Sequence, residues 1–574
     1  MMIDGKEVNY TATAGHLIAK LPEGTPNADQ AAVFYMAYTR DDLPRKDRPV
    51  TFFWNGGPGS SSIFLHMGSW APKRVKTGMP IMPAEAKVKK PDNFPLIDNE
   101  EVLLDHSDLV FVDPVGTGLS QAIKPHKNID FWGMDEDAAL LRDFITRYIN
   151  VNQRQSSPKY LYGESYGGIR TPVVAKLMLK AGTSSYAPDP SGEKAIAYSG
   201  MVLNSPILDY NSNCEMNRFL SCAGFMPSYG MTADYYKKGT LRGGASVAEF
   251  VETMRAFTRD KYLPAHQAKY TQAYSFVKAA YIEAKHQYAH FLKYNRTELD
   301  WQFRAGWSAT ANTLSYGTKL ADLILKTPNL IGVGAVDAER KAFVDKFMIN
   351  PYQTMKLVTE HLEAGTKVPS GAWAAFISTL EGSQFLADMT SITGINLDWA
   401  REFDINVYDF KEKLLPGESM NPYDARLSIP KGAYDITFYE DESFQKSLNT
   451  VLTDVFDFQS NTPYKPNNFD EIGKVWKYRD SSSVYAKSSL PDIVETLGYA
   501  PSAKILVLHG YYDLVTPFHQ TELDLINMKL DNRIPVKNYE GGHMTYESEE
   551  ARAPMKQELD KFYTTPLSSA IMTQ

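Results

Sequence analysis

Residues 159–168 read Lys-Tyr-Leu-Tyr-Gly-Glu-Ser-Tyr-Gly-Gly, and this stretch decides the fold. Its apolar start, Lys159–Tyr162, predicts a strand, and the residues from Gly167 to Met178 predict a helix. Between the two, Gly163 to Gly167 follow the pattern G-x-S-x-G, whose small glycines permit a tight strand-to-helix turn. Such a turn exposes the serine hydroxyl above a sheet, so Ser165 is a candidate nucleophile. The alternative is a solvent-exposed serine in an ordinary turn.

Short apolar runs alternate with helical patterns on both sides of this turn. Between two of the runs, Met134–Val151 places its apolar residues on one helical face. Strands that alternate with helices indicate an α/β fold with a mostly parallel central sheet covered on both sides. The predicted strands are Ala31–Thr39, Pro49–Trp54, Asp108–Asp113, Lys159–Tyr162, Gly200–Asn204, Lys504–Leu508 and Pro535–Tyr539.

The middle of the chain differs, because strand signals are sparse there and tyrosine-rich helical patterns dominate. We therefore expect residues 1–210 and 479–574 to form two parts of one core, and residues 211–478 to form a large, mainly helical insertion that caps the site. An aromatic stripe from Tyr270 to Phe291 recurs at helical spacing, and we interpret it as core packing of this insertion.

Composition limits the classes of function. The chain has 574 residues, 43% of them hydrophobic, and a formal charge of −8, which are typical of a globular protein without a nucleic-acid-binding surface. The longest apolar run is far below the roughly 18 residues of a membrane span. The first six residues, Met-Met-Ile-Asp-Gly-Lys, do not resemble a signal peptide. We expect a cytoplasmic protein if this chain is the full length, and a periplasmic or secreted one if a leader has been removed.

Two cysteines, Cys214 and Cys222, exclude a disulfide scaffold and a multi-cysteine metal cluster. They either pair across a short loop or stay free, and the sequence favours neither alternative. His286 and His290 have a metal-ligand spacing but lack the H-E-x-x-H pattern, so we interpret them as a surface pair. We therefore expect neither a metal nor a cofactor.

A serine nucleophile needs a neighbouring base and an acid that orients the base. In α/β-hydrolases these follow in the order Ser, Asp or Glu, His. Asp513 follows the strand Lys504–Leu508, and His543 lies in a glycine-containing loop after the last strand, so we expect them to complete a triad with Ser165. Two nearer histidines, His509 at a strand end and His519 in the next helix, are expected to have packing or surface roles.

The glycine-rich segment Asn55-Gly56-Gly57-Pro58-Gly59-Ser60-Ser61-Ser62 follows a predicted strand. Closely spaced glycines let main-chain N–H groups approach a substrate and stabilise an oxyanion. We expect the N–H groups of Gly57 and Tyr166 to form this oxyanion hole. Without a triad nearby, the same glycines would be an ordinary turn.

Together these motifs resemble the serine carboxypeptidase family, whose members have the α/β-hydrolase fold. The resemblance rests on Asn55–Ser62, Val112–Ser120, Gly163–Gly168, the Asp513 segment and Gly542–Met544. It implies that Ser165, Asp513 and His543 are the triad, that Asn55, Gly56 and Glu164 bind the terminal carboxylate of the substrate, and that the partners are the carboxyl termini of peptides or proteins.

Two positions depart from the family pattern. Ser60 stands where the family usually has a cysteine, and His66 falls where a second carboxylate-binding glutamate is expected. If His66 takes that glutamate's place, a cationic imidazole below pH of about 6.5 would help to attract the substrate carboxylate. The alternative is a structural role for His66.

The sequence therefore predicts a serine-type carboxypeptidase that works through an acyl-enzyme on Ser165. An esterase or acyltransferase with the same triad is one alternative, and an aminopeptidase directed at proline is another. A catalytically inactive binding protein on a hydrolase fold is a fourth possibility, which the complete set of Ser165, Asp513 and His543 disfavours.

Overall fold

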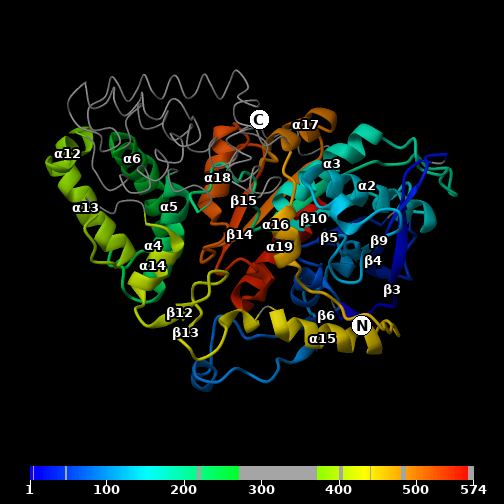
Figure 1. Ribbon diagram of the computed structural model, residues 1–574, viewed down its shortest axis with the longest axis horizontal. Helices are drawn as coiled ribbons and strands as arrows, with labels where there is room; N and C mark the ends of the chain where they lie inside the picture. Colours follow the sequence, from blue (N-terminus) through cyan, green and yellow to red (C-terminus); the bar gives the residue numbers. More distant parts are fainter. Residues whose placement is uncertain are drawn as a thin grey trace, which may run out of the picture.

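A nine-stranded, mostly parallel sheet forms the centre of the computed structural model (Figure 1). The structure describes residues 1–269 and 371–566, except 4, 23, 46–47, 216–220, 400–404, 440 and 480–486. In spatial order, the strands are β15 (Val536–Tyr539), β14 (Lys504–Gly510), β11 (Gly200–Asn204), β10 (Lys159–Glu164), β5 (Val50–Trp54), β8 (Asp108–Val112), β4 (Asp29–Arg40) and β3 (Tyr10–Lys20). The six strands from β15 to β8 are parallel, whereas β4 and β3 are antiparallel to their neighbours and the short β9 (Gln121–Ala122) pairs with β4.

The strands predicted from the sequence are present, with ends that differ by one or two residues. One long strand, β3, was not predicted. Its first six residues, Tyr-Thr-Ala-Thr-Ala-Gly, are small or polar, and its apolar run is limited to Leu17-Ile18-Ala19. The strand lies half-exposed at the edge of the sheet, so its hydrophobic signal is weaker than that of the buried strands.

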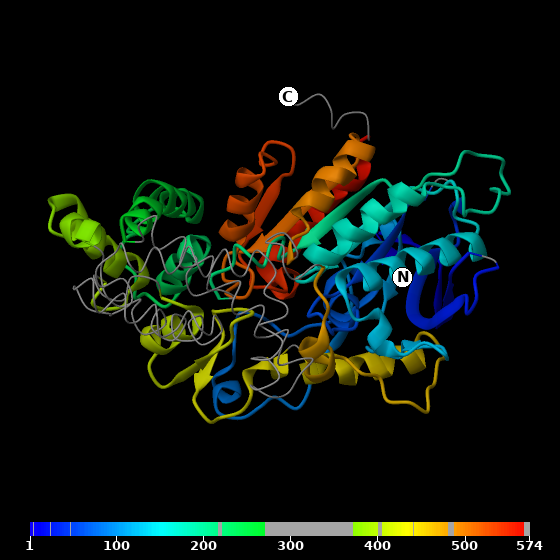
Figure 2. The ribbon, with the colours of Figure 1, turned by 45° about the horizontal axis from the view of Figure 1, so that its top comes forward.

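Helices cover both faces of the sheet. On one face lie α2 (Met134–Val151), α3 (Gly167–Ala181) and α17 (Leu490–Tyr499), whose apolar side chains share one hydrophobic cluster with the strands. On the other face lie α15 (Asp441–Asp454) and α19 (Glu549–Thr564), which belong to a second cluster. In Figure 2 the cyan helices α2 and α3 and the yellow helix α15 lie on opposite sides of the blue strands. This layering is the one that the alternation of strands and helices predicted.

Helix α2 illustrates why these residues form helices. Its first turn carries Asp135, Glu136 and Asp137, whose negative charges stabilise the positive end of the helix dipole. Its buried residues, among them Leu141, Phe144 and Tyr148, recur at helical spacing and face the sheet.

Within the insertion expected from the sequence, the described residues are mainly helical, and their hydrophobic cluster also includes Tyr512, Leu514 and Phe518 from the segment after β14. The helices of the insertion are grouped at the left of Figure 1, away from the sheet. They are α4 (Met226–Tyr235), α5 (Val247–Phe257), α6 (Leu263–Lys269), α12 (Gly371–Ile377), α13 (Leu380–Thr393) and α14 (Val407–Leu414). The short strands β12 (Glu418–Met420) and β13 (Ser428–Pro430) follow, before α15 and α16 (Phe469–Val475). The aromatic stripe from Tyr270 to Phe291 lies outside the described residues.

The remaining described α-helices and strands are two or three residues long, apart from α18, whose Phe518 and Leu525 are buried in two hydrophobic clusters. These elements are β1 (Met2–Ile3), β2 (Lys6–Glu7), α1 (Ile63–Leu65), β6 (Lys73–Val75), β7 (Leu96–Asp98) and α18 (Phe518–Asn527).

No helix in the described part of the chain is long and apolar enough to cross a membrane.

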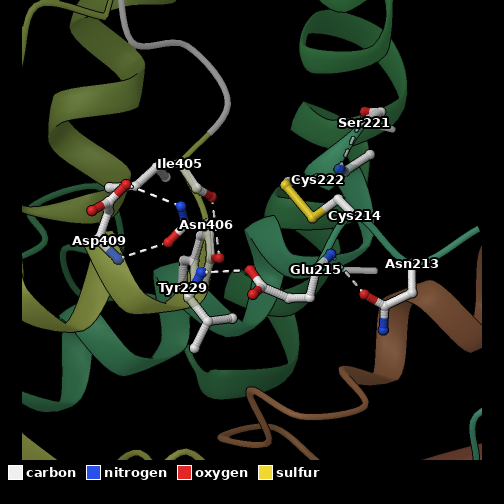
Figure 3. The surroundings of a disulfide bond; sticks show 11 residues. Asn213, Cys214, Glu215, Ser221, Cys222, Tyr229, Ile405, Asn406 and Asp409 are labelled. Atoms are coloured by element: carbon white, nitrogen blue, oxygen red, sulfur yellow. Dashed lines mark hydrogen bonds between the residues drawn. A yellow bond between two sulfur atoms is a disulfide. The ribbon is translucent and has the colours of Figure 1, made fainter. Parts of the chain in front are cut away.

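The two cysteines form a disulfide, which settles the alternative that the sequence left open (Figure 3). Cys214 and Cys222 are eight residues apart and both are buried in the cluster of the insertion. Next to the bond, the Glu215 carboxylate accepts a 2.7 Å hydrogen bond from the Val407 N–H at the start of α14. The disulfide therefore joins two residues near the beginning of the insertion, and the Glu215 contact ties this segment to α14.

Candidate active site

Ser165 occupies the sharp turn between β10 and α3. Its φ of 62° lies in the left-handed region, which is unfavourable for a residue with a side chain. Hydrogen bonds hold this conformation: the Ser165 N–H donates to the Asn204 carbonyl at 3.1 Å, and the Ser165 carbonyl accepts from Gly168 at 2.8 Å and from Ile207 at 3.0 Å. The turn is therefore fixed by the neighbouring strand β11 and by the first turn of α3.

Glycines on both sides of Ser165 make the turn possible. A Cβ atom on Gly163 would lie 2.0 Å from the hydroxyl of Thr171, and one on Gly168 would lie 2.4 Å from the side chain of Pro206. Neither position has room for a side chain, so helix α3 packs directly against the end of β10. Within the G-x-S-x-G motif, Gly163 therefore has a steric reason, whereas a Cβ atom on Gly167 would lie 3.5 Å from the Trp54 carbonyl oxygen, an ordinary van der Waals contact.

The imidazole of His543 contacts the carboxylate of Asp513. His543 Nδ1 lies 2.8 Å from Asp513 Oδ2, and both side chains are buried. The other oxygen, Asp513 Oδ1, accepts the main-chain N–H groups of Val515 at 2.7 Å and Thr516 at 3.0 Å. The Thr516 hydroxyl donates to Asp513 Oδ2 at 2.8 Å, so the carboxylate is held on both oxygens. With Nδ1 facing Asp513, the Nε2 atom of His543 remains for a proton transfer.

The electrostatics of the Asp513–His543 pair stabilise an ionised carboxylate and increase the proton affinity of the imidazole. Burial disfavours both charges, but the mutual attraction and their hydrogen bond outweigh it. The pKa of Asp513 is consequently lowered and the pKa of His543 is raised from their usual values. Such a pair has the electrostatics that a general base next to a nucleophile needs.

Ser165 and His543 line the same pocket, which has a volume of about 440 Å³. The pocket also contains the three groups that the sequence assigned to the substrate carboxylate, Asn55, Gly56 and Glu164, and Gly57 of the predicted oxyanion hole. The other lining residues come from the loop after β5, from α1, from residues 423–469 and from the loops after β14 and β15: Ser60, Phe64, Tyr423, Thr437, Asp441, Asn467, Phe469, Val515 and Met544.

Glu164 is buried at the pocket wall between two amides. Asn55 Nδ2 donates to its Oε1 at 2.7 Å, and Asn204 Nδ2 donates to its Oε2 at 3.1 Å. Burial raises the pKa of Glu164 to about 7, against the opposing effects of the nearby His543 and the hydrogen bonds. At acidic pH the carboxyl group is therefore neutral and retains a proton that it can donate.

The loop after β5 lies against the nucleophile turn. Gly56 has no space for a side chain, since a Cβ atom there would lie 2.4 Å from the Tyr166 nitrogen and 2.8 Å from Ser165 Cβ. Gly57 has a φ of +104°, which glycine adopts without strain. Gly56 thus lets this loop approach the turn at Ser165, and Gly57, which the sequence predicts as an oxyanion donor, lines the same pocket as Ser165.

Two supporting residues of this site were missed from the sequence. Asn204, at the end of β11, joins Glu164 to the His543 carbonyl, to which it donates at 3.2 Å. Asp113, buried after β8, accepts the N–H and the hydroxyl of Ser62 at 2.9 and 2.7 Å and so holds the loop after β5. Both follow parallel strands at their carboxyl ends, which is the signal that would have indicated them.

His66 does not line the pocket, contrary to the role considered from the sequence. It lies in a π-helical turn (His66–Trp70), is 1% exposed, and its Nε2 is 2.8 Å from the Tyr38 hydroxyl. Its ring packs against Phe111 at a centroid distance of 4.6 Å. Burial lowers the pKa of His66 to about 3, so the imidazole is neutral at mildly acidic pH. His66 therefore lies in the core, and its neutral imidazole cannot attract the substrate carboxylate by charge.

His509, His519 and the cluster of Asp105, His106 and Asp560 do not line this pocket. His509 and His519 are buried in packing positions, as expected, and His509 contacts the Thr521 hydroxyl at 3.0 Å. Among the described residues, Asp105, His106 and Asp560 are close enough together to hold a metal ion, but the Lys556 ammonium group already contacts both carboxylates. His286 and His290 lie outside the described residues.

A mostly parallel sheet with a serine at positive φ directly after a central strand defines an α/β-hydrolase. Within this class, the family model described as "Serine carboxypeptidase" matches residues 4–316, more than half of the chain. The chain belongs to the serine carboxypeptidase family.

Individual relatives are distant and match over part of their length. A pheromone-processing carboxypeptidase kex1 from Aspergillus oryzae is 26% identical over 252 residues, which are 43% of this chain and 33% of that protein. A serine carboxypeptidase-like protein from Oryza sativa subsp. japonica is 29% identical over 163 residues, 28% of this chain and 34% of that protein. The match thus spans about a third of each curated relative. The crystal structure of Kex1(delta)p, a prohormone-processing carboxypeptidase from Saccharomyces cerevisiae, aligns with a TM-score of 0.47 at 15% identity, over 96% of this chain and 91% of that one.

Proposed function

We propose that this protein is a serine-type carboxypeptidase that releases the last residue of a peptide through an acyl-enzyme on Ser165. One observation carries the proposal: the Asn55–Glu164 pair lies in the same pocket as Ser165 and His543. A hydrolase that only needed to cleave an ester would require the serine and histidine, but no neutral carboxyl group beside them. The pair therefore supports recognition of a free carboxylate next to the scissile bond.

Acylation uses the serine, the histidine and the main-chain donors. Ser165 Oγ attacks the carbonyl carbon of the last peptide bond, and His543 Nε2 accepts the hydroxyl proton. Asp513, bound to Nδ1 at 2.8 Å, stabilises the imidazolium. The N–H groups of Gly57 and Tyr166 donate to the oxyanion of the tetrahedral intermediate. The C–N bond then breaks, His543 protonates the departing amine, and the terminal residue leaves.

Deacylation repeats these steps with water. A water molecule attacks the carbonyl carbon of the acyl-enzyme while His543 accepts one of its protons. The bond to Ser165 Oγ breaks, the proton returns to the serine, and the shortened peptide leaves with a new carboxyl terminus. These residues suffice for each proton transfer and each charge that develops.

Recognition of the terminal carboxylate assigns a role to Glu164. A protonated Glu164 donates a hydrogen bond to the carboxylate, whereas an ionised one repels it. Asn55 supplies a further N–H from its amide, and Gly56 brings main-chain atoms close because it has no side chain. Binding the carboxylate here limits cleavage to the last peptide bond.

The test is the digestion of one peptide in three forms: free acid, carboxyl-terminal amide, and free acid with a blocked amino group. The proposal expects stepwise loss of carboxyl-terminal residues from both free acids and strongly reduced cleavage of the amide, measured by mass spectrometry. Cleavage of the unblocked peptide alone, from its amino end, would instead identify an aminopeptidase. Activity on esters without activity on any peptide would identify an esterase, or an acyltransferase if an added alcohol is acylated.

A further inference from the structure

The loop between β12 and β13 connects the insertion to both triad loops of the core. We call residues 421–427, Asn-Pro-Tyr-Asp-Ala-Arg-Leu, the clamp loop. It is closed by its own hydrogen bonds, from the Asn421 N–H to the Leu427 carbonyl at 2.9 Å and from the Leu427 N–H to the Asp424 carbonyl at 3.0 Å. The clamp loop is therefore an ordered turn, and the groups that it presents have fixed positions.

The clamp loop binds the chain on both sides of Asp513. The Ala425 N–H donates to the Tyr512 carbonyl at 3.0 Å, and the Leu514 N–H donates to the Pro422 carbonyl at 3.0 Å. Because Tyr512 and Leu514 are the immediate neighbours of Asp513, these two bonds fix the main chain that carries the acid.

The same loop binds the chain at His543. The His543 N–H donates to the Tyr423 carbonyl at 2.6 Å, and the two rings lie 5.4 Å apart at the pocket wall. Gly542 makes this approach possible, since a Cβ atom on it would lie 2.3 Å from the Tyr423 oxygen. Consecutive residues of one turn thus contact the acid loop and the base loop directly.

Arg426 ties the clamp loop together. Its Nε and Nη2 donate to the two oxygens of Asp424 at 2.9 and 2.7 Å, and its Nη1 donates to the Glu540 carbonyl in the base loop at 3.2 Å. The guanidinium carbon lies 4.6 Å from the centre of the Tyr512 ring in the acid loop. Arg426 and Asp424 are 5% and 4% exposed, so loss of either partner leaves a buried charge without compensation.

We propose that the clamp loop is a positioning element that sets the distance and orientation of His543 relative to Asp513, with Arg426 as its principal tie. The inference rests on the proposed function, which gives this histidine and aspartate their roles. Asp513 and His543 follow different strands, β14 and β15, and each lies several residues beyond the last paired residue of its strand. Displacements of about 1 Å in such a pair cost up to about a hundredfold in rate, so a third element that holds both loops has a direct effect on turnover.

The experiment compares Arg426→Met, which keeps the apolar stem, and Arg426→Lys, which keeps the charge but not the two-pronged contact. The matched control is Arg48→Met. Arg48 is also buried and pairs with an aspartate, Asp108, but at the opposite ends of the strands from the site. Active sites are counted with a labelled fluorophosphonate, kcat and KM are measured per labelled site, and proton NMR records the low-field resonance of the proton between His543 Nδ1 and Asp513.

We expect Arg426→Met to lower kcat per site by about tenfold or more, with KM within about threefold of wild type, and to shift or broaden the low-field resonance. Arg426→Lys should give an intermediate kcat, and Arg48→Met should lower thermal stability but leave kcat per site and the resonance unchanged. Equal effects of Arg426→Met and Arg48→Met, or an unchanged kcat and resonance in Arg426→Met, would overturn the inference. If Arg426→Met does not fold, Arg426→Lys decides by the same two readouts. Wild-type protein that fluorophosphonate does not label would contradict the proposed function, while the resonance still tests the clamp loop.

Discussion

The amide of Asn55 donates a 2.7 Å hydrogen bond to the carboxyl group of Glu164, directly beside the nucleophile turn. The carbonyl oxygen of the same amide accepts the Leu65 N–H at 3.0 Å, which fixes the orientation of the amide. Glu164 is thereby held at the pocket wall with its pKa raised by burial to about 7. Under the proposed function, the ionisation of Glu164 would therefore influence which substrates bind.

Replacing Ser165 with alanine should abolish turnover and leave the fold intact. Loss of a triad nucleophile typically lowers kcat by several orders of magnitude. The measurement is peptide hydrolysis together with fluorophosphonate labelling, and thermal unfolding checks that the variant is folded. A folded Ser165→Ala protein that keeps more than about a tenth of the wild-type rate would show that another residue is the nucleophile.

Binding of free-acid peptides should weaken as the pH rises through 7. Below its pKa of about 7, Glu164 is protonated and donates to the substrate carboxylate, whereas above it the two negative charges repel. We therefore expect KM for free-acid peptides to rise from pH 6 to pH 8 in the wild type and to stay flat in Glu164→Gln, which cannot ionise.

Ester substrates without a carboxylate provide the control and should show no such trend in KM. The charge of Glu164 also contributes to the raised pKa of His543, so Glu164→Gln should move the acid limb of ester hydrolysis to lower pH. A KM that rises with pH equally in the variant and the wild type would exclude Glu164 as the titrating group.

His66 should affect stability at acidic pH rather than substrate binding. Its pKa is about 3 in the folded protein and about 6.5 when unfolded, so the unfolded chain binds a proton first. The contribution of neutral His66 to the free energy of unfolding is therefore complete above pH 6.5 and is lost as the pH falls toward 3. His66→Gln should flatten the decrease in melting temperature between pH 8 and pH 5.

The control for this variant is His126→Gln, since His126 lies at the surface and contacts the Asn27 carbonyl. Both variants should keep the wild-type dependence of KM on pH. If His66→Gln instead raised KM for free-acid peptides at acidic pH and left the melting curves unchanged, His66 would be a substrate-binding residue after all.

Removal of metal ions should leave activity unchanged. The triad supplies the nucleophile and the base, and main-chain N–H groups stabilise the oxyanion, so no step of the proposed reaction needs a cation. Dialysis against EDTA should keep kcat/KM within about twofold of the untreated protein. A loss that zinc reverses would contradict this mechanism and direct attention to Asp105, His106 and Asp560, or to His286 and His290.

Local features of this protein were predictable from the sequence. The turn at Ser165 depends on glycines within a few residues of it. The strands β5, β8, β10, β11 and β14 are short buried runs, so each leaves a signal in consecutive residues. The order of Ser165, Asp513 and His543 followed from their positions after predicted strands. The edge strand β3 was not predicted, because its small and polar first residues carry little hydrophobic signal.

Only the tertiary structure decided which way several side chains and loops face. It pairs Cys214 with Cys222, turns His66 toward Tyr38 and away from the pocket, and joins Tyr423 of the insertion to His543, 120 residues further along the chain. In each case the outcome depends on which way a side chain or loop faces once the chain has packed. In the sequence, His66 aligns with the position of a carboxylate-binding glutamate. In the structure, His66 begins a π-helical turn and its ring is buried against aromatic rings.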